Sequence, residues 1–256
     1  MLTNEDDIAE CMNEYFASVF TAENLVNFPL FDQVIKDKDL SLLQCSPEDV
    51  SKILSKLKPR ESPRPDSIHP MILKECAGTL ASSLCDVFHA SFASSMLPYN
   101  WKLADITPLH KKGAKNDRKN YRPVSLTSVV YKVCEMIVRQ QLVQFWITNE
   151  VFIPELFGFL KGKSCVSQLL SSFHDWASER NKGFTTDYVF LDLSKTFEPV
   201  PHERRSTKIH AYGIQGPLLS WLGSFLTNRT VLGPILFLIY INDISLCQTQ
   251  NSLPMI

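Results

Sequence analysis

The chain reads Tyr-Val-Phe-Leu-Asp-Leu from Tyr188 to Leu193, and this apolar run predicts a buried β-strand that reaches an acid at its end. A carboxylate at the edge of a sheet can hold a hard cation such as Mg²⁺ through its oxygen atoms. A strand-end aspartate also commonly accepts hydrogen bonds in a cap or turn. Asp192 alone therefore leaves both interpretations open.

Helices are expected on both sides of this strand. Ser46-Pro47-Glu48-Asp49 predicts a helix start, because it combines a capping hydroxyl, a proline in the first turn and two acids. The apolar spacing predicts further helices over 71–92, 127–146, 164–177 and 217–226, and a short strand over 104–109. This order of elements predicts an α/β or α+β protein with a helix-rich first part.

The composition excludes several classes of protein. With 256 residues, of which 45% are hydrophobic and 21% charged, the chain is expected to bury a core, unlike a disordered or collagen-like chain. The acidic N-terminus does not resemble a signal peptide, and the longest apolar run, Val231–Ile241, is shorter than the roughly 20 residues of a membrane span. Seven cysteines without a C-x-x-C pair predict reduced, mostly buried thiols of an intracellular protein, in the nucleus or cytoplasm, rather than disulfides or a zinc site.

The near-neutral net charge hides an asymmetry. Residues 1–50 carry eleven acids and two bases, a net charge of −9, whereas residues 102–139 carry nine bases and three acids, a net charge of +6. A basic block of this kind indicates contact with a polyanion such as nucleic acid, although a solvated surface turn has the same composition. Lys111 and Arg122 are the candidate phosphate ligands in this block, and a structural ion pair is the alternative for Arg122.

Five sequence blocks, in the same order, resemble the reverse transcriptases of non-LTR (LINE-type, jockey-like) retrotransposons. These blocks are 101–113, Asn120-Tyr121-Arg122-Pro123-Val124-Ser125-Leu126-Thr127, 157–165, 190–202 and 231–244. The resemblance implies the helix-rich fingers and an incomplete palm of a right-hand polymerase, which acts on an RNA template, a DNA primer and deoxynucleotides. It divides the chain into an acidic N-terminal segment (1–45), a fingers-like region (46–185) and a truncated palm (186–256).

The resemblance also assigns roles to particular residues. Asp192, assisted by the carbonyl of Leu193, would hold Mg²⁺, and Phe197 would lie against the sugar of the incoming nucleotide. Lys111 and Arg122 would bind the triphosphate. Contacts to the nucleic-acid backbone are expected from Lys112, Lys115, Arg118 and Lys119.

The sequence departs from the family at two places. Asn228-Arg229-Thr230 is followed directly by Val231, where the family has a strand pair and a glycine-rich turn that shapes the nucleotide pocket. The paired aspartates of the family's later catalytic motif are also missing. A single carboxylate at Asp192 should hold two Mg²⁺ ions poorly, so the chain as it stands is expected to be an inactive polymerase. The alternatives are a non-catalytic RNA- or DNA-binding protein that uses the basic fingers, and an incomplete translation of a working polymerase.

Overall fold

The computed structural model describes residues 4–18, 31–59, 65–185, 187, 202–225 and 232–242. The helices in this part of the chain are α1 (Glu5–Ser18), α2 (Pro47–Leu54), α3 (Pro70–Glu75), α4 (Ala77–Ser94), α5 (Tyr99–Lys102), α6 (Val129–Thr148), α7 (Cys165–Asn181), α8 (His202–Ala211), α9 (Gly216–Phe225) and α10 (Gly233–Ile241). The strands β1 (Ala104–His110) and β2 (Tyr121–Thr127) form an antiparallel two-stranded sheet. The predicted helix-rich α+β class is confirmed.

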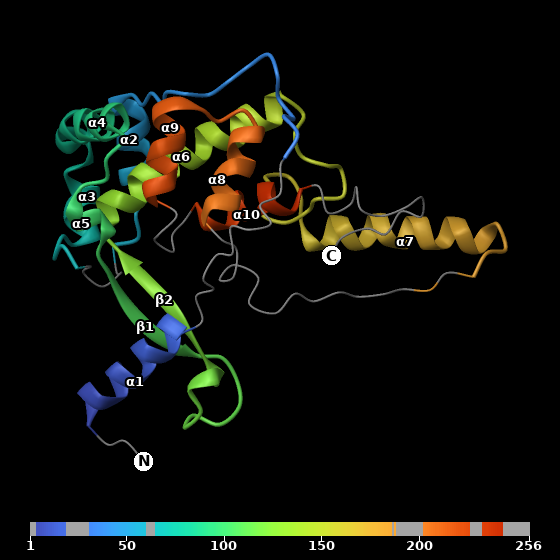
Figure 1. Cartoon of the computed structure of the whole chain (residues 1–256), viewed down its shortest axis with the longest axis horizontal. Coiled ribbons are helices and arrows are strands. Elements are labelled where there is room, and N and C mark those ends of the chain that lie inside the picture. The colour runs from blue at the N-terminus through green and yellow to red at the C-terminus, as the bar shows by residue number, and fades with distance from the viewer. Residues whose placement is uncertain are drawn as a thin grey trace.

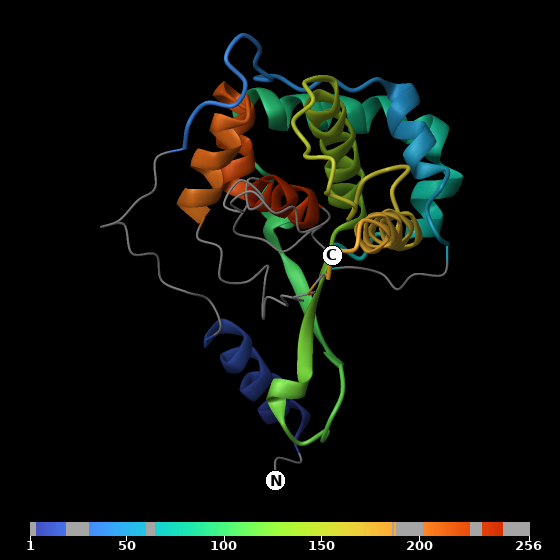
Figure 2. The ribbon, with the colours of Figure 1, turned by 90° about the vertical axis from the view of Figure 1, so that its right-hand side faces the viewer.

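A helical body carries a projecting hairpin. Helices α2 to α6 and α8 to α10 gather into this body, and the β1–β2 hairpin extends from one side of it (Figure 1). The view at a right angle shows the hairpin in the same position, with α1 beside its far end (Figure 2). Helix α7 extends from the body in a different direction (Figure 1). The hairpin is therefore presented to solvent away from the hydrophobic core.

Helix α6 is the centre of the core. Buried side chains surround most of its circumference in its first ten residues, and Val133, Val138 and Trp146 are fully buried. The Trp146 indole Nε1 donates to the Tyr212 carbonyl at 3.0 Å, which ties α6 to the turn after α8. A helix that is apolar on most sides must be covered on most sides, and α2, the segment 31–45 and α8 to α10 supply this cover.

The extended segment 31–45 lies over the turn between α8 and α9. Leu40 forms a parallel bridge with Ile214, and the Leu40 N–H donates to the Gly213 carbonyl at 2.8 Å. Gly213 has φ +83°, and a Cβ at this position would lie 3.1 Å from the Phe145 ring and 3.2 Å from Ile35. Only glycine allows this left-handed turn to lie so close to both neighbours.

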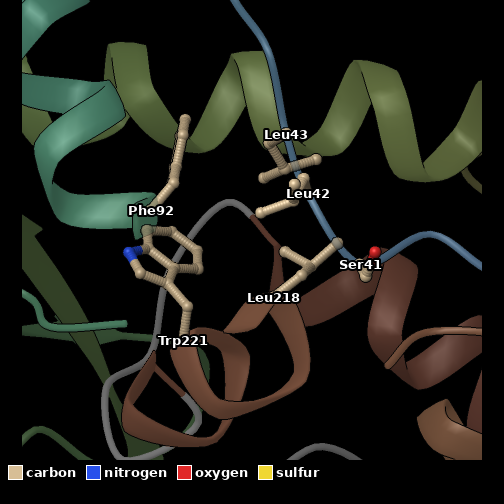
Figure 3. A pocket seen from close by; sticks show the side chains of 6 residues that line it. All are labelled: Ser41, Leu42, Leu43, Phe92, Leu218 and Trp221. Carbon is tan, nitrogen blue, oxygen red and sulfur yellow. The ribbon is translucent and has the colours of Figure 1, made fainter. Parts of the chain in front are cut away.

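An aromatic pair joins α4 to α9. Phe92 and Trp221 meet edge to face with ring centroids 5.4 Å apart, and the Trp221 Nε1 donates to Ser91 Oγ at 3.0 Å. These rings, with Ser41, Leu42, Leu43 and Leu218, line a shallow depression (Figure 3). The depression has no room for a water-sized molecule, so it is a packing seam and not a ligand site.

The observed helix limits agree with the sequence at some places and differ at others. The predicted start at Ser46 is confirmed, because Ser46 and Asp49 form a capping box. The single helix expected over 71–92 is instead α3 and α4, separated at Cys76, whose backbone leaves the helical region with ψ 16°. Gly78 follows this break, and glycine has a low helix propensity. The strand expected over Tyr188–Leu193 lies outside the described residues.

Ser128 connects the hairpin to the body. It is the single residue between β2 and α6, and its Oγ caps α6 by accepting from the Tyr131 N–H at 3.4 Å. The same hydroxyl donates to Asp66 Oδ2 at 2.5 Å. The base of the hairpin is thus held both by the first turn of α6 and by the loop that precedes α3.

None of the helices described by the structure combines the length and the apolar character that crossing a membrane requires.

We predict that Ser46→Ala lowers the free energy of unfolding by about 1 kcal/mol at neutral pH, because the cap of α2 is lost. The Ser46 side chain, and then its backbone N–H, hydrogen-bond to the Asp49 carboxylate and lower the pKa of Asp49. A lowered pKa stabilises the fold above the ordinary carboxyl pKa and ceases to do so as the pH falls through the folded value. The deficit in the free energy of unfolding of Ser46→Ala should therefore be smaller in acid than at neutral pH.

Urea unfolding near neutral pH and in acid measures this deficit. Ser82→Ala is the control, because Ser82 is exposed within α4. A deficit in Ser46→Ala that is the same at both pH values would contradict the role of Asp49.

Candidate nucleic-acid interface

The register of the hairpin fixes where its basic residues point. Leu109 pairs with Arg122 and His110 pairs with Tyr121, and the ladder continues when the Lys111 N–H donates to the Asn120 carbonyl at 2.8 Å. Side chains alternate between the faces of a strand, and paired residues share a face. Lys111 and Arg122 therefore lie on the same face of the ribbon, in diagonal positions.

The opposite face holds the connecting loop in place. His110 and Tyr121 meet edge to face with ring centroids 5.2 Å apart. The His110 Nε2 lies 3.0 Å from the Gly113 carbonyl, and the Tyr121 hydroxyl donates to the Lys115 carbonyl at 2.9 Å. His110 and Tyr121 on this face therefore help to hold the loop, while the other face presents the two basic residues that the sequence singled out.

The loop depends on glycine at one position. Gly113 has φ +84°, and a Cβ there would lie 2.7 Å from Asn120 Nδ2. That amide donates to the Ala114 carbonyl at 2.9 Å and closes the loop across its middle. Asp117 then starts a 3-10 turn over Arg118–Asn120 by accepting from the Lys119 N–H at 2.9 Å. The loop has a defined shape although it projects into solvent.

The structure places all six predicted basic residues on this hairpin, and each is exposed: Lys111, Lys112, Lys115, Arg118, Lys119 and Arg122. Arg118 also contacts helix α1. Its guanidinium carbon lies 5.4 Å from the centre of the Tyr15 ring, and its Nη1 lies 3.9 Å from the Cys11 sulfur. The N-terminal helix therefore packs beside the basic loop, a contact that sequence patterning did not predict.

Three predicted site residues cannot be placed. Asp192, Leu193 and Phe197 lie outside the described residues, so their expected roles at a metal ion and a nucleotide stay predictions.

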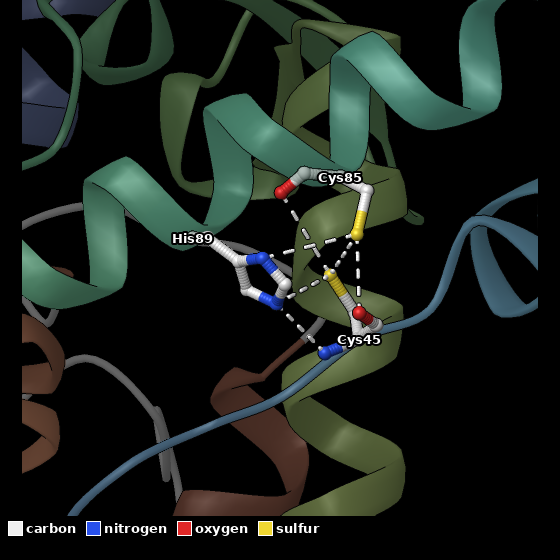
Figure 4. Close-up of side chains that lie close together, drawn as sticks. All are labelled: Cys45, Cys85 and His89. Carbon is white, nitrogen blue, oxygen red and sulfur yellow. Dashed lines mark hydrogen bonds between the residues drawn. The ribbon is translucent and has the colours of Figure 1, made fainter.

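A second polar cluster lies in the helical body and was missed by the sequence reasoning. Cys45, Cys85 and His89 meet with Cys45 Sγ 3.2 Å from Cys85 Sγ and 3.6 Å from His89 Nε2 (Figure 4). Burial, and then the neighbouring Cys85, raises the pKa of the Cys45 thiol to about 12. The spacing of Cys85 and His89, four residues apart on a predicted helix, was the available signal.

Not all cysteines follow the expectation of buried thiols. Cys45, Cys85 and Cys134 are buried, whereas Cys76 and Cys165 are exposed and Cys11 is half-buried. All six are free thiols in the described part of the chain. The exposed pair lies at helix starts, where Cys76 precedes α4 and Cys165 begins α7.

We predict that Gly113→Ala disrupts the loop locally, at a cost of roughly 1–2 kcal/mol for a left-handed non-glycine residue, and leaves the helical body folded. The amide of Lys111, which bonds to Asn120, should then exchange hydrogen faster with solvent. Gly158→Ala is the matched control, because a Cβ at Gly158 meets nothing within 4 Å. Unchanged exchange at Lys111 in Gly113→Ala would show that the loop does not need this glycine.

Comparison with known proteins identifies a family whose match begins in the hairpin. Residues 109–252 match the family described as reverse transcriptase (RNA-dependent DNA polymerase). A probable RNA-directed DNA polymerase from transposon BS of Drosophila melanogaster is 23% identical over 94% of this chain and 30% of its own length. The corresponding protein from the X-element of the same fly is 24% identical over 80% of this chain and 25% of its own length.

A third relative is the retrovirus-related Pol polyprotein from the type-1 retrotransposable element R1 of Bradysia coprophila, 30% identical over 46% of this chain and 12% of its own length. The chain thus spans less than a third of the length of each of these relatives. The resemblance to non-LTR retrotransposon reverse transcriptases is confirmed. Because the family match covers more than half of its residues, the chain belongs to the reverse transcriptase (RNA-dependent DNA polymerase) family.

Proposed function

We propose that this chain is a retrotransposon-derived reverse transcriptase domain that binds nucleic acid and the triphosphate of a deoxynucleotide through its basic hairpin. The observation that carries the proposal is the placement of Lys111 and Arg122 on one face of an exposed ribbon. A planar guanidinium binds two phosphate oxygens at once, and an ammonium adds a flexible point charge. Together they suit a triphosphate better than a single phosphate.

The rest of the loop suits a nucleic-acid backbone. Lys112, Lys115 and Lys119 are exposed at the tip, where they can reach phosphates without reading bases. Arg118, which lies beside Tyr15, is exposed among them. An RNA template and a DNA primer are the partners that this family membership favours, inside the cell in the nucleus or cytoplasm. Segment 1–45, fingers 46–185 and palm 186–256 are the proposed divisions of the chain.

The second part of the proposal is that the chain does not extend a primer. Two-metal phosphoryl transfer needs several carboxylates around two Mg²⁺ ions. Asp192 and the Leu193 carbonyl would offer ligands, and Phe197 would select against ribose, but residues 193–256 contain no two adjacent aspartates. This donor set does not fit a pair of Mg²⁺ ions.

The junction at Thr230–Val231 also supports inactivity. Asn228-Arg229-Thr230 runs directly into Val231-Leu232-Gly233-Pro234, so the glycine-rich turn that shapes the family's nucleotide pocket is not between them. Catalytic geometry tolerates little displacement, since about 1 Å of misplacement costs on the order of 10²-fold in rate. A non-catalytic RNA- or DNA-binding protein that uses the same hairpin is the alternative, and the hairpin geometry favours it equally.

We predict that the chain binds single-stranded RNA with an affinity that falls with salt, and that Lys112→Ala/Lys115→Ala weakens this binding. Each lost phosphate contact should reduce the slope of log affinity against log salt by about 0.7, so the double variant should lose about 1.4. Filter binding over a series of salt concentrations measures the slope.

The matched control removes two exposed lysines from another face. Lys36 and Lys38 are exposed in the segment 31–45. This segment runs along the side of the body away from the hairpin (Figures 1 and 2). Lys36→Ala/Lys38→Ala has the same net charge as the hairpin variant and should keep the wild-type slope. A slope near zero for the wild type, or an equal loss in both variants, would exclude the hairpin as the contact surface.

We predict no extension of oligo(dT) on poly(rA) by this chain with dTTP and Mg²⁺, because the metal donors and the pocket turn are incomplete. An active reverse transcriptase run in parallel shows that the assay works. Extension by this chain that disappears in Asp192→Asn would establish a working polymerase. Salt-dependent binding without extension would support the inactive domain and its non-catalytic alternative alike.

A further inference from the structure

We propose that Cys45, Cys85 and His89 form a Zn²⁺ site that joins the segment before α2 to helix α4. The cluster lies in the helical body and belongs to none of the elements of the basic hairpin. Its three ligand atoms come from two segments forty residues apart, and all lie within 4.8 Å of one another. A bound ion would act as a cross-link between these segments.

Two of the three distances between the ligand atoms are close to those of a tetrahedral site. With Zn–S near 2.3 Å and Zn–N near 2.0–2.1 Å, two sulfurs should lie about 3.8 Å apart and a sulfur and a nitrogen about 3.6 Å apart. Cys45 Sγ lies 3.6 Å from His89 Nε2 and 3.2 Å from Cys85 Sγ. To bind the ion, the two sulfurs would separate by about half an ångström, and Cys85 Sγ, which lies 4.0 Å from His89 Nδ1, would move toward Nε2.

The imidazole already presents the correct nitrogen. His89 Nε2 accepts a hydrogen bond from the Cys45 N–H at 3.2 Å, so its lone pair points toward Cys45 (Figure 4). A neutral ring in this tautomer keeps its proton on Nδ1, which lies 4.0 Å from Cys85 Sγ. Zinc binding through Nε2 would exchange the hydrogen bond from Cys45 for a coordinate bond without a tautomer change.

The backbone holds the ligands in position before any ion binds. Cys85 and His89 are four residues apart on α4, so they share one face of a helix. Cys45 directly precedes Ser46, whose capping box fixes the start of α2. Two well-defined helices therefore set the ligand spacing, as a rigid metal site requires.

The cluster can be reached from solvent on one side. The thiols are buried, whereas His89 is exposed and opens the cluster to solvent. On binding, both thiols would release their protons to solvent, and a water would take the fourth position on the His89 side.

The ligand types select zinc over the harder ions of the polymerase family. Two thiolates and an imidazole suit Zn²⁺, whereas Mg²⁺ prefers oxygen ligands. A disulfide between Cys45 and Cys85 is the competing outcome, because the sulfurs are close. It would require them to approach from 3.2 Å to about 2.05 Å and would need an oxidant.

The test measures the zinc content of the purified chain by mass spectrometry after dialysis against Zn²⁺ and then against buffer, and its zinc affinity by competition with a chelator. We expect one Zn²⁺ per chain, and affinity lower by at least about tenfold in Cys85→Ala and in His89→Ala. Cys76→Ala and Cys165→Ala are the matched controls, because both cysteines are exposed and outside the cluster. These two variants should keep the wild-type zinc content.

A second measurement uses only the wild-type chain, in case the variants fail to fold. Co²⁺ in place of Zn²⁺ should give the strong thiolate-to-cobalt absorption of a tetrahedral site, and a chelator should lower the melting temperature. No zinc and no cobalt absorption in the wild type would overturn the proposal. So would an equal loss in the control variants, or a Cys45–Cys85 disulfide found by mass spectrometry in the freshly purified chain.

Discussion

The burial of helix α6 is the constraint on which the rest of the structure depends. Its first ten residues bury side chains around most of the helix, so no single neighbouring layer can cover it. The segment 31–45, helix α2 and helices α8 to α10 therefore converge on α6 from different parts of the chain. Where these segments meet, the Trp146 indole donates a hydrogen bond to the Tyr212 carbonyl. Gly213 allows the chain to turn there beside Phe145.

Local signals in the sequence predicted the elements well, and tertiary effects account for the misses. The cap at Ser46 and the apolar spacing of 127–146 predicted two helices whose positions the structure confirms. Strand β2 was not predicted, because it forms by pairing with β1 across the loop between them rather than from a pattern of its own. The break at Cys76 was missed because the apolar spacing continues across it.

The two polar sites show what a sequence alone can and cannot supply. The excess of basic charge over 102–139 was visible, but the common face of Lys111 and Arg122 depends on a register set across a ten-residue loop. The cysteine cluster was even harder to predict from the sequence. Cys45 is forty residues from Cys85, and only the packing of α2 against α4 brings the two together. Contacts of this kind form only in the tertiary structure, and local periodicity does not predict them.

Because Ser128 is the single residue between β2 and α6, a movement of the hairpin is passed directly to the helical body. A free two-stranded ribbon is barely stable in water, so this one depends on its attachment to the body as well as on the contacts of its loop. The attachment at Ser128 consists of the first turn of α6 and the hydrogen bond to Asp66. A force on the loop, such as a bound ligand would exert, would therefore act on both α6 and the loop before α3.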